Sequence, residues 1–162
     1  MSLLDWQFII AILLSMAPVI ELRGGMPIAI HYALTHNISS LLTFFLIVLA
    51  NIVVIFIIFF FLDFLHEKFL KFRAYKRFSD FYLSKVRRKA DNVEKKMGNW
   101  GFFALAIFVG IPLPGTGAWT GTIIAWLLGL ERKRSILSIA LGVLIAGILV
   151  FLATIGILEF IL

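Results

Sequence analysis

An apolar stretch of the chain is interrupted by prolines and glycines at residues 110–122, Gly-Ile-Pro-Leu-Pro-Gly-Thr-Gly-Ala-Trp-Thr-Gly-Thr. Pro112 and Pro114 lack a backbone N–H and force extended geometry on the residues before them. Gly115 and Gly117 permit backbone angles that other residues resist. A helix that enters this apolar sequence is therefore expected to end here. In lipid, an irregular backbone survives only where protein buries it or a water-filled cavity lies beside it, so the break is a candidate site.

The composition is that of a membrane protein. Of the 162 residues, 62% are hydrophobic, whereas a soluble domain has about 45–50% apolar residues. The length suits a single domain, and the first residues lack the basic start and small-residue cleavage site of a signal peptide. The chain has no cysteine and only three histidines, so disulfides are excluded and neither a metal site nor another cofactor is expected.

Positive charge is concentrated in residues 63–98. This segment carries eleven of the 15 Lys and Arg residues and five of the nine acidic residues, so it holds the whole net charge of +6. Basic loops between membrane segments stay in the cytoplasm, and nucleic-acid binding is the weaker interpretation. Apolar residues recur among the cations at helical spacing, which predicts one or two amphipathic helices on the cytoplasmic membrane surface. The segment is either a connector that fixes topology or a lipid sensor.

Two apolar segments are long enough to cross a membrane, for which about 20 residues are needed. They are residues 41–62, with Asn51 near the centre, and residues 135–158. The two Pro/Gly breaks, residues 18–27 and 112–117, are flanked by shorter apolar pieces that cannot cross alone, namely 7–17, 28–35, 101–111 and 118–130. Small residues on the second span predict close helix contacts, within this chain or in a homo-oligomer, at Gly142, Ala146, Ala153 and Gly156.

The order of these segments occurs twice. A shift of 94 positions places Trp6 on Trp100 and Pro18 on Pro112. Each half then contains a short apolar piece, a Pro/Gly break, a second short apolar piece, a polar turn and a long span. The prediction is one membrane domain, 1–162, in which residues 1–62 and 99–162 form two repeats joined by the connector 63–98.

Charge decides how the two repeats are expected to lie in the membrane. Arg132, Lys133 and Arg134 form a basic turn at 131–134. If both broken segments crossed the membrane, this turn would face outside, against the positive-inside rule. If each broken segment enters and returns as a re-entrant hairpin, the turn lies in the cytoplasm and both termini lie outside. The predicted fold is therefore all-α, with re-entrant helical hairpins and transmembrane helices in two inverted repeats, as in many secondary transporters of the cell membrane.

The first break carries the only ionisable residues of either hairpin core, Glu21 and Arg23. A charge inside the membrane costs roughly 2.5–3.5 kcal/mol on insertion scales, so the pair either stabilises the fold or serves a function. The guanidinium of Arg23 suits a phosphate or carboxylate, and open amides at Gly24, Gly25 and the second break add anion-binding partial charge. A partly buried Glu21 can exchange a proton. The combination suits a proton-coupled carrier of an anionic headgroup, or a cation carrier with Glu21 as its exchange site.

Three further residues are candidates for substrate or proton binding. Asn51 either lines the transport path or makes a structural bond between helices. Thr116 lies at the second break, and Trp119 either packs in that hairpin or sits at its rim. No nucleophile–base pair or metal-ligand cluster is evident in the membrane region of the sequence, so an enzyme is not expected.

Three sequence motifs carry a resemblance to a known family. They are Ile20-Glu-Leu-Arg-Gly-Gly-Met-Pro27, Ala50-Asn51 and Ile111-Pro-Leu-Pro-Gly-Thr-Gly-Ala-Trp-Thr-Gly121. Together they resemble the small multidrug export protein family, which is in turn similar to the DedA (VTT-domain) superfamily of membrane transporters. That resemblance implies two facing re-entrant hairpins and proton-linked transport of polyprenyl-phosphate or phospholipid carriers. At the positions of this chain that match the family's motifs, the resemblance implies that Glu21, Arg23 and the loop 112–117 form the site.

One position departs from the DedA pattern, in which an acidic residue follows the glycine of a Pro-x-Pro-Gly string, because Thr116 follows Gly115 here. The leading hypothesis is proton-coupled transport of a lipid-linked or amphiphilic anionic substrate, a lipid phosphate. The alternatives are a proton-coupled exporter of small compounds and a non-transporting membrane scaffold. The expected partners are membrane lipids, protons and the substrate. The candidate site comprises Glu21, Arg23, Gly24, Gly25, Asn51, Pro112, Pro114, Gly115, Thr116, Gly117 and Trp119.

Overall fold

The computed structural model describes residues 6–70 and 100–161, which are helical apart from short connections. In chain order the helices are α1 (Trp6–Met16), α2 (Glu21–Thr35), α3 (Ser40–Phe69), α5 (Trp100–Gly110), α6 (Ala118–Leu128) and α7 (Arg132–Ile161). The predicted all-α class is confirmed for this part of the chain, and short and long helices follow one another as the sequence predicts. Most of the predicted amphipathic connector, residues 71–98, lies outside the described residues.

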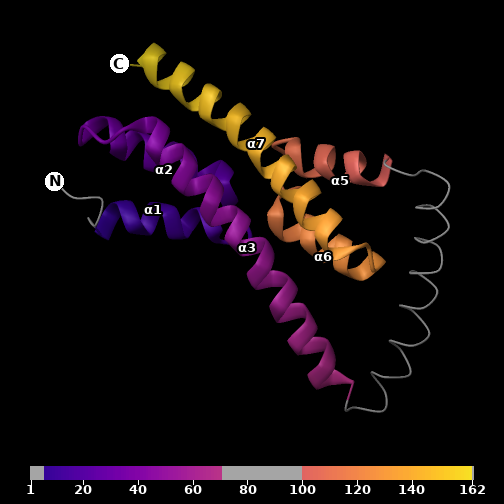
Figure 1. Ribbon diagram of the computed structural model, residues 1–162. Helices are drawn as coiled ribbons and strands as arrows, with labels where there is room; N and C mark the ends of the chain where they lie inside the picture. The colour runs from indigo at the N-terminus through magenta and orange to yellow at the C-terminus, as the bar shows by residue number, and fades with distance from the viewer. Residues whose placement is uncertain (1–5, 71–99, 162) are drawn as a thin grey trace.

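Helices α3 and α7 are long and apolar enough to cross a membrane. Both extend across the molecule in Figure 1, and the shorter helices pack against them. Large apolar side chains on these two helices face outward, among them Phe45, Phe60 and Leu152. Soluble proteins rarely expose contiguous apolar surface on this scale, so these faces suit contact with lipid.

Both long helices extend beyond the apolar segments predicted to span the membrane. α3 continues to Phe69 instead of ending at residue 62, and α7 begins at Arg132 instead of residue 135. Charged residues limit the apolar span, but they are compatible with a helix, and no proline or glycine lies in either extension. The ends of the apolar segments therefore did not predict the ends of the helices.

The first break is shorter than the sequence predicts. Only residues 17–20 separate α1 from α2, and α2 continues through Pro27. A proline inside a helix removes one backbone hydrogen bond, here to the carbonyl of Arg23. The side chains of Met26 and Ile30 beside it are fully buried, and their packing stabilises the helix through this position.

Each pair of short helices folds back at its break. α1 packs along α2, while α5 packs against both α6 and α7. Figure 1 shows the α1–α2 pair on the left and the α5–α6 pair on the right, with their two connections near the centre of the molecule. The two breaks, far apart in the sequence, are thereby brought together.

Close packing of α5 on α7 depends on a glycine. A Cβ atom on Gly142 would lie 2.6 Å from the carbonyl oxygen of Ala106 and 2.6 Å from the Cβ atom of Val109. Ala146, one turn further along α7, is buried. Gly156 makes no such contact within the described chain, because an added methyl group there would have no described atom within 4 Å; a contact of Gly156 in a homo-oligomer stays a prediction.

Candidate functional site

Glu21 begins α2 in a left-handed backbone conformation. Its φ is +48°, a region that costs a non-glycine residue roughly 1–2 kcal/mol. Its N–H donates to the carbonyl of Ala17 at 2.8 Å, which closes the turn between α1 and α2. The residue is only 4% exposed. Backbone strain of this kind persists only where the surroundings hold the residue in place, and it is concentrated at functional sites.

The second break is a loop organised by Thr116. The hydroxyl of Thr116 lies 2.7 Å from the carbonyl oxygen of Ile111 and 2.9 Å from that of Leu113. Gly115, the residue directly before Thr116, has a φ of +82°, which glycine adopts without strain. Pro112, Pro114 and Gly115 are exposed. The predicted break at 112–117 therefore agrees closely with the structure, in which α5 ends at Gly110 and α6 begins at Ala118.

Hydrogen bonds join the two breaks directly. Arg23 donates from Nη2 to the Thr116 hydroxyl at 2.9 Å and to the Ile111 carbonyl at 3.4 Å. In the opposite direction, the indole Nε1 of Trp119 donates to the carbonyl of Met16 at 2.9 Å. Each break thus contributes a side chain that bonds to the backbone of the other. We call this the inter-break contact.

The carboxylate of Glu21 lies at the N-terminus of α6. Its Oε1 accepts the backbone N–H of Trp119 at 3.3 Å. The N-cap residue of α6 is Gly117, which has no side chain to cap the helix. A Cβ atom on Gly117 would overlap the Glu21 carboxylate, so Glu21 occupies the space that a capping side chain would fill. A negative charge there satisfies a free N–H and complements the helix dipole.

Glu21 and Arg23 also form an ion pair, with 3.4 Å between Oε2 and Nη1. Side chains two positions apart on a regular helix point in different directions. The left-handed conformation of Glu21 departs from that geometry and allows the two groups to meet. The Nε atom of Arg23 is buried with no hydrogen-bond partner among the described residues. Arg23 therefore keeps an unused donor at the inter-break contact.

The two glycines of the first break do not offer the open amides that were expected. Gly24 donates its N–H to the carbonyl of Ile20 at 3.1 Å, within the first turn of α2. Gly25 is a packing position, since a Cβ atom there would lie 2.5 Å from the Cα atom of Ser15. The backbone N–H that meets a carboxylate at this site is that of Trp119, at the start of α6.

Asn51 is buried between α3 and α1. Its Nδ2 donates to the carbonyl of Ile47 at 3.0 Å and lies 3.4 Å from the hydroxyl of Ser15. It therefore links α3 to α1, which matches the structural alternative considered for this residue. Ser15 was not singled out from the sequence, although it is the one hydroxyl within the apolar run of α1.

Few groups at the site can carry charge or hold an ion. Within residues 6–70 and 100–161, no cluster of three or more His, Asp or Glu side chains could hold a metal. The described contacts at the breaks involve one carboxylate, one guanidinium, one hydroxyl and one indole. This arrangement can exchange a proton, pair with a charged substrate and open by breaking few bonds.

The fold and the site define an α-helical membrane protein in which two broken segments meet around a buried charge pair. The chain belongs to the family described as "Putative small multi-drug export protein", whose family model matches residues 21–149. This confirms the family that the motifs indicate, while the wider similarity to the DedA superfamily stays a prediction. No curated protein and no solved structure shows a significant match to the chain.

Proposed function

We propose that this protein is a proton-coupled exporter of small amphiphilic compounds, with the inter-break contact as its exchange site. The observation that carries the proposal is the position of Glu21, whose buried carboxylate reaches from α2 to the first turn of α6. Ionisable groups at the meeting point of broken membrane helices are typical binding sites for substrates and coupling ions. The family description names export as the direction and drugs as the substrate class.

The proposal includes two re-entrant hairpins, α1–α2 and α5–α6, in inverted repeats. An ion pair between Asp63 and Arg132 supports it, because it joins the end of α3 to the start of α7. The positive-inside rule assigns this end of the molecule to the cytoplasm, together with the basic segment 63–98. On this assignment α5–α6 starts and ends on the cytoplasmic side, and α1–α2 starts and ends outside.

Exchange at Glu21 follows from its partners. The ionised carboxylate is stabilised by the Trp119 N–H and by Arg23. A cationic compound can pair with the same carboxylate, because Arg23 keeps its bonds to Thr116 and to the Ile111 carbonyl when it releases Glu21. Protonation removes the negative charge and releases the compound. Since the carboxylate cannot hold a proton and a cation together, their exchange couples export to inward proton movement.

The test is ethidium export from vesicles that contain the purified full-length protein. Vesicles are loaded with ethidium and placed in a buffer more acidic than their lumen. We expect the wild-type protein to accelerate ethidium loss and Glu21→Gln to abolish the part that depends on the gradient. Glu67→Gln is the matched control, because it removes the same charge from an exposed position and should behave as wild type. Gradient-driven export by Glu21→Gln at the wild-type rate would refute the proposal.

Arg23 favours lipid-phosphate transport as a second candidate function. Its planar guanidinium and its Nε, which has no partner among the described residues, suit a phosphate group, the group that the predicted similarity to the DedA superfamily would imply. A phosphate would then compete with Glu21 for Arg23 and for the start of α6. The same vesicles distinguish the functions when they carry a labelled polyprenyl phosphate. If the wild-type protein translocates that lipid but does not export ethidium, and Arg23→Lys loses the translocation, the protein is a lipid transporter. If neither compound is transported, the scaffold is favoured.

A further inference from the structure

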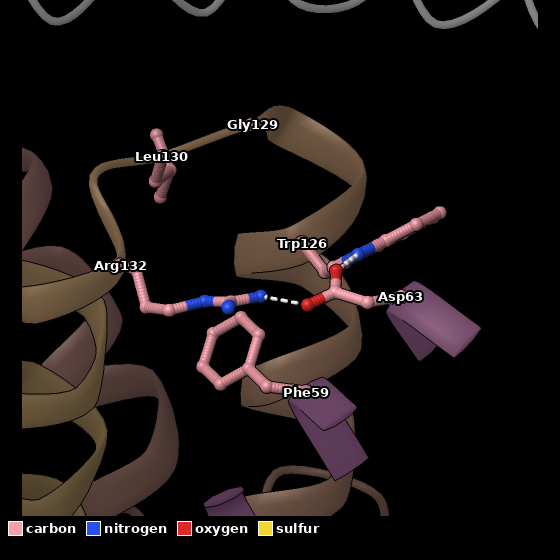
Figure 2. Close-up of a pocket in the computed structure, with 6 residues that line it drawn as sticks. All are labelled: Phe59, Asp63, Trp126, Gly129, Leu130 and Arg132. Carbon is pink, nitrogen blue, oxygen red and sulfur yellow. Dashed lines mark hydrogen bonds and ion pairs between the residues drawn. The ribbon is translucent and has the colours of Figure 1, made fainter. Parts of the chain in front are cut away.

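A second polar cluster lies where α3, α6 and the start of α7 meet, away from the inter-break contact. It surrounds a cavity of about 230 Å³ lined by Phe59, Asp63, Trp126, Gly129, Leu130 and Arg132. Figure 2 shows the side chains of Asp63, Trp126 and Arg132 converging from three helices, with the Phe59 ring beside the Arg132 guanidinium. We call this the inner pocket, since the proposed topology places it at the cytoplasmic end.

The Asp63 carboxylate is shared between two donors. The indole Nε1 of Trp126 donates to Oδ1 at 2.8 Å, and the guanidinium of Arg132 donates to Oδ2. The Arg132 Cζ atom also lies 5.0 Å from the centroid of the Phe59 ring. A carboxylate and an aromatic face therefore surround a resident cation, which is the combination that proteins use to bind organic cations.

The resident cation is in a position to be displaced. The side chain of Arg132 is 53% exposed and that of Asp63 is 40% exposed, and ion pairs with this much exposure are weak. When Arg132 turns away, it leaves a carboxylate held in place by Trp126, an apolar wall and an aromatic ring.

We infer that the inner pocket binds small organic cations, such as quaternary ammonium compounds with one aromatic group, in place of the Arg132 guanidinium. The inference rests on the proposed function. In that function the inner pocket is the site where the exported compound binds from the cytoplasm before it exchanges with a proton at Glu21. The purely structural alternative is that the Asp63–Arg132 pair holds the turn between α6 and α7 against α3.

Equilibrium dialysis of radiolabelled benzyltrimethylammonium against the full-length protein in phosphatidylcholine nanodiscs tests the inference. We expect Asp63→Asn to weaken binding at least roughly tenfold, because the opposite charge is lost. Phe59→Leu should weaken it roughly two- to fivefold, the size of an exposed cation–π interaction. Each variant is also measured with Glu21→Gln, so that binding at the inter-break contact does not mask the pocket.

Arg132→Gln separates the two roles of the cluster. If Arg132 occupies the site as a competitor, its removal tightens binding roughly two- to fivefold, as expected for loss of a partly exposed ion pair. Lys133→Gln removes the same charge from the neighbouring position, which does not line the pocket, and should leave the affinity unchanged. Weaker binding in Arg132→Gln would show that the pair is structural and overturn the inference, and so would binding that does not depend on Asp63.

The two proposals fail separately. Export that depends on Glu21, combined with cation binding that is independent of Asp63, overturns the inner pocket alone. Binding that depends on Asp63, combined with export unaffected by Glu21→Gln, overturns the exchange mechanism alone.

Discussion

At the scale of single residues, Glu21 and Gly117 act as one unit. A capping residue normally supplies its own side chain to the first turn of a helix. In this protein the cap of α6 is a glycine, and the carboxylate arrives from α2. The helix end is therefore stabilised only while the two breaks are in contact. A change that removes the charge of Glu21, including its protonation, is therefore expected to weaken both the inter-break contact and the start of α6.

Gly117→Ala should destabilise the protein by about 1–3 kcal/mol, the usual cost of forcing extra volume into a packed site. The added methyl group would overlap the Glu21 carboxylate, so the carboxylate has to leave the first turn of α6. The measurement is loss of helical circular dichroism during titration with SDS. Gly101→Ala is the control, because no described atom lies within 4 Å of the added methyl group. Equal stability of Gly117→Ala and wild type would contradict the assignment of Glu21 as the cap.

The sequence identified the charged residues of the site and named Thr116 and Trp119 as further candidates, but it did not show which bonds join them. Glu21 and Arg23 could be found because a charge in apolar sequence is costly and rarely accidental. Their bonds to Trp119 and Thr116 cross more than ninety positions and depend on how the helices pack, which local patterns do not encode. The positive-inside rule uses Arg132 only to assign a side of the membrane, and it does not predict the ion pair of Arg132 with Asp63.

At the scale of helices, prolines and glycines predicted the second break well and the first break poorly. Pro112 and Pro114 end a helix because no buried face continues across them, and the loop between α5 and α6 is largely exposed. Pro27 has the same local chemistry, but buried neighbours on α2 hold the helix through it. A proline therefore ends a helix only where packing does not compensate for the lost hydrogen bond.

The α5–α7 contact gives a second test of packing. Gly142→Ala should cost about 1–3 kcal/mol, because the new methyl group meets the backbone carbonyl of Ala106 and the side chain of Val109. Gly156→Ala, on the same helix, should instead be neutral or stabilise the protein by up to about 1 kcal/mol through helix propensity. Both are measured by SDS titration. If the two variants shift stability alike, the tight crossing of α5 and α7 at Gly142 is wrong.

At the scale of the whole molecule, the contacts connect the two proposed sites through α6. Glu21 caps the start of this helix, and Trp126 near its end donates to Asp63. α6 has only 11 residues, and we expect so short a helix to move as one body. Release of Glu21 and loosening of the inner pocket are therefore expected to accompany one another in the proposed export cycle.

The proposed topology determines which side of the membrane each connection faces. The chain has no native cysteine, so Lys133→Cys introduces a single thiol at the exposed start of α7. Because Arg132 pairs with Asp63 at the end of α3, we expect a membrane-impermeant maleimide to label this thiol only from the cytoplasmic side. Asn37→Cys, in the exposed connection between α2 and α3, is the control and should be labelled only from outside. If both thiols react from the same side, α3 does not separate the two connections. If Lys133→Cys reacts from outside and Asn37→Cys from the cytoplasm, the repeats are inserted in the opposite sense, and the inner pocket opens to the exterior.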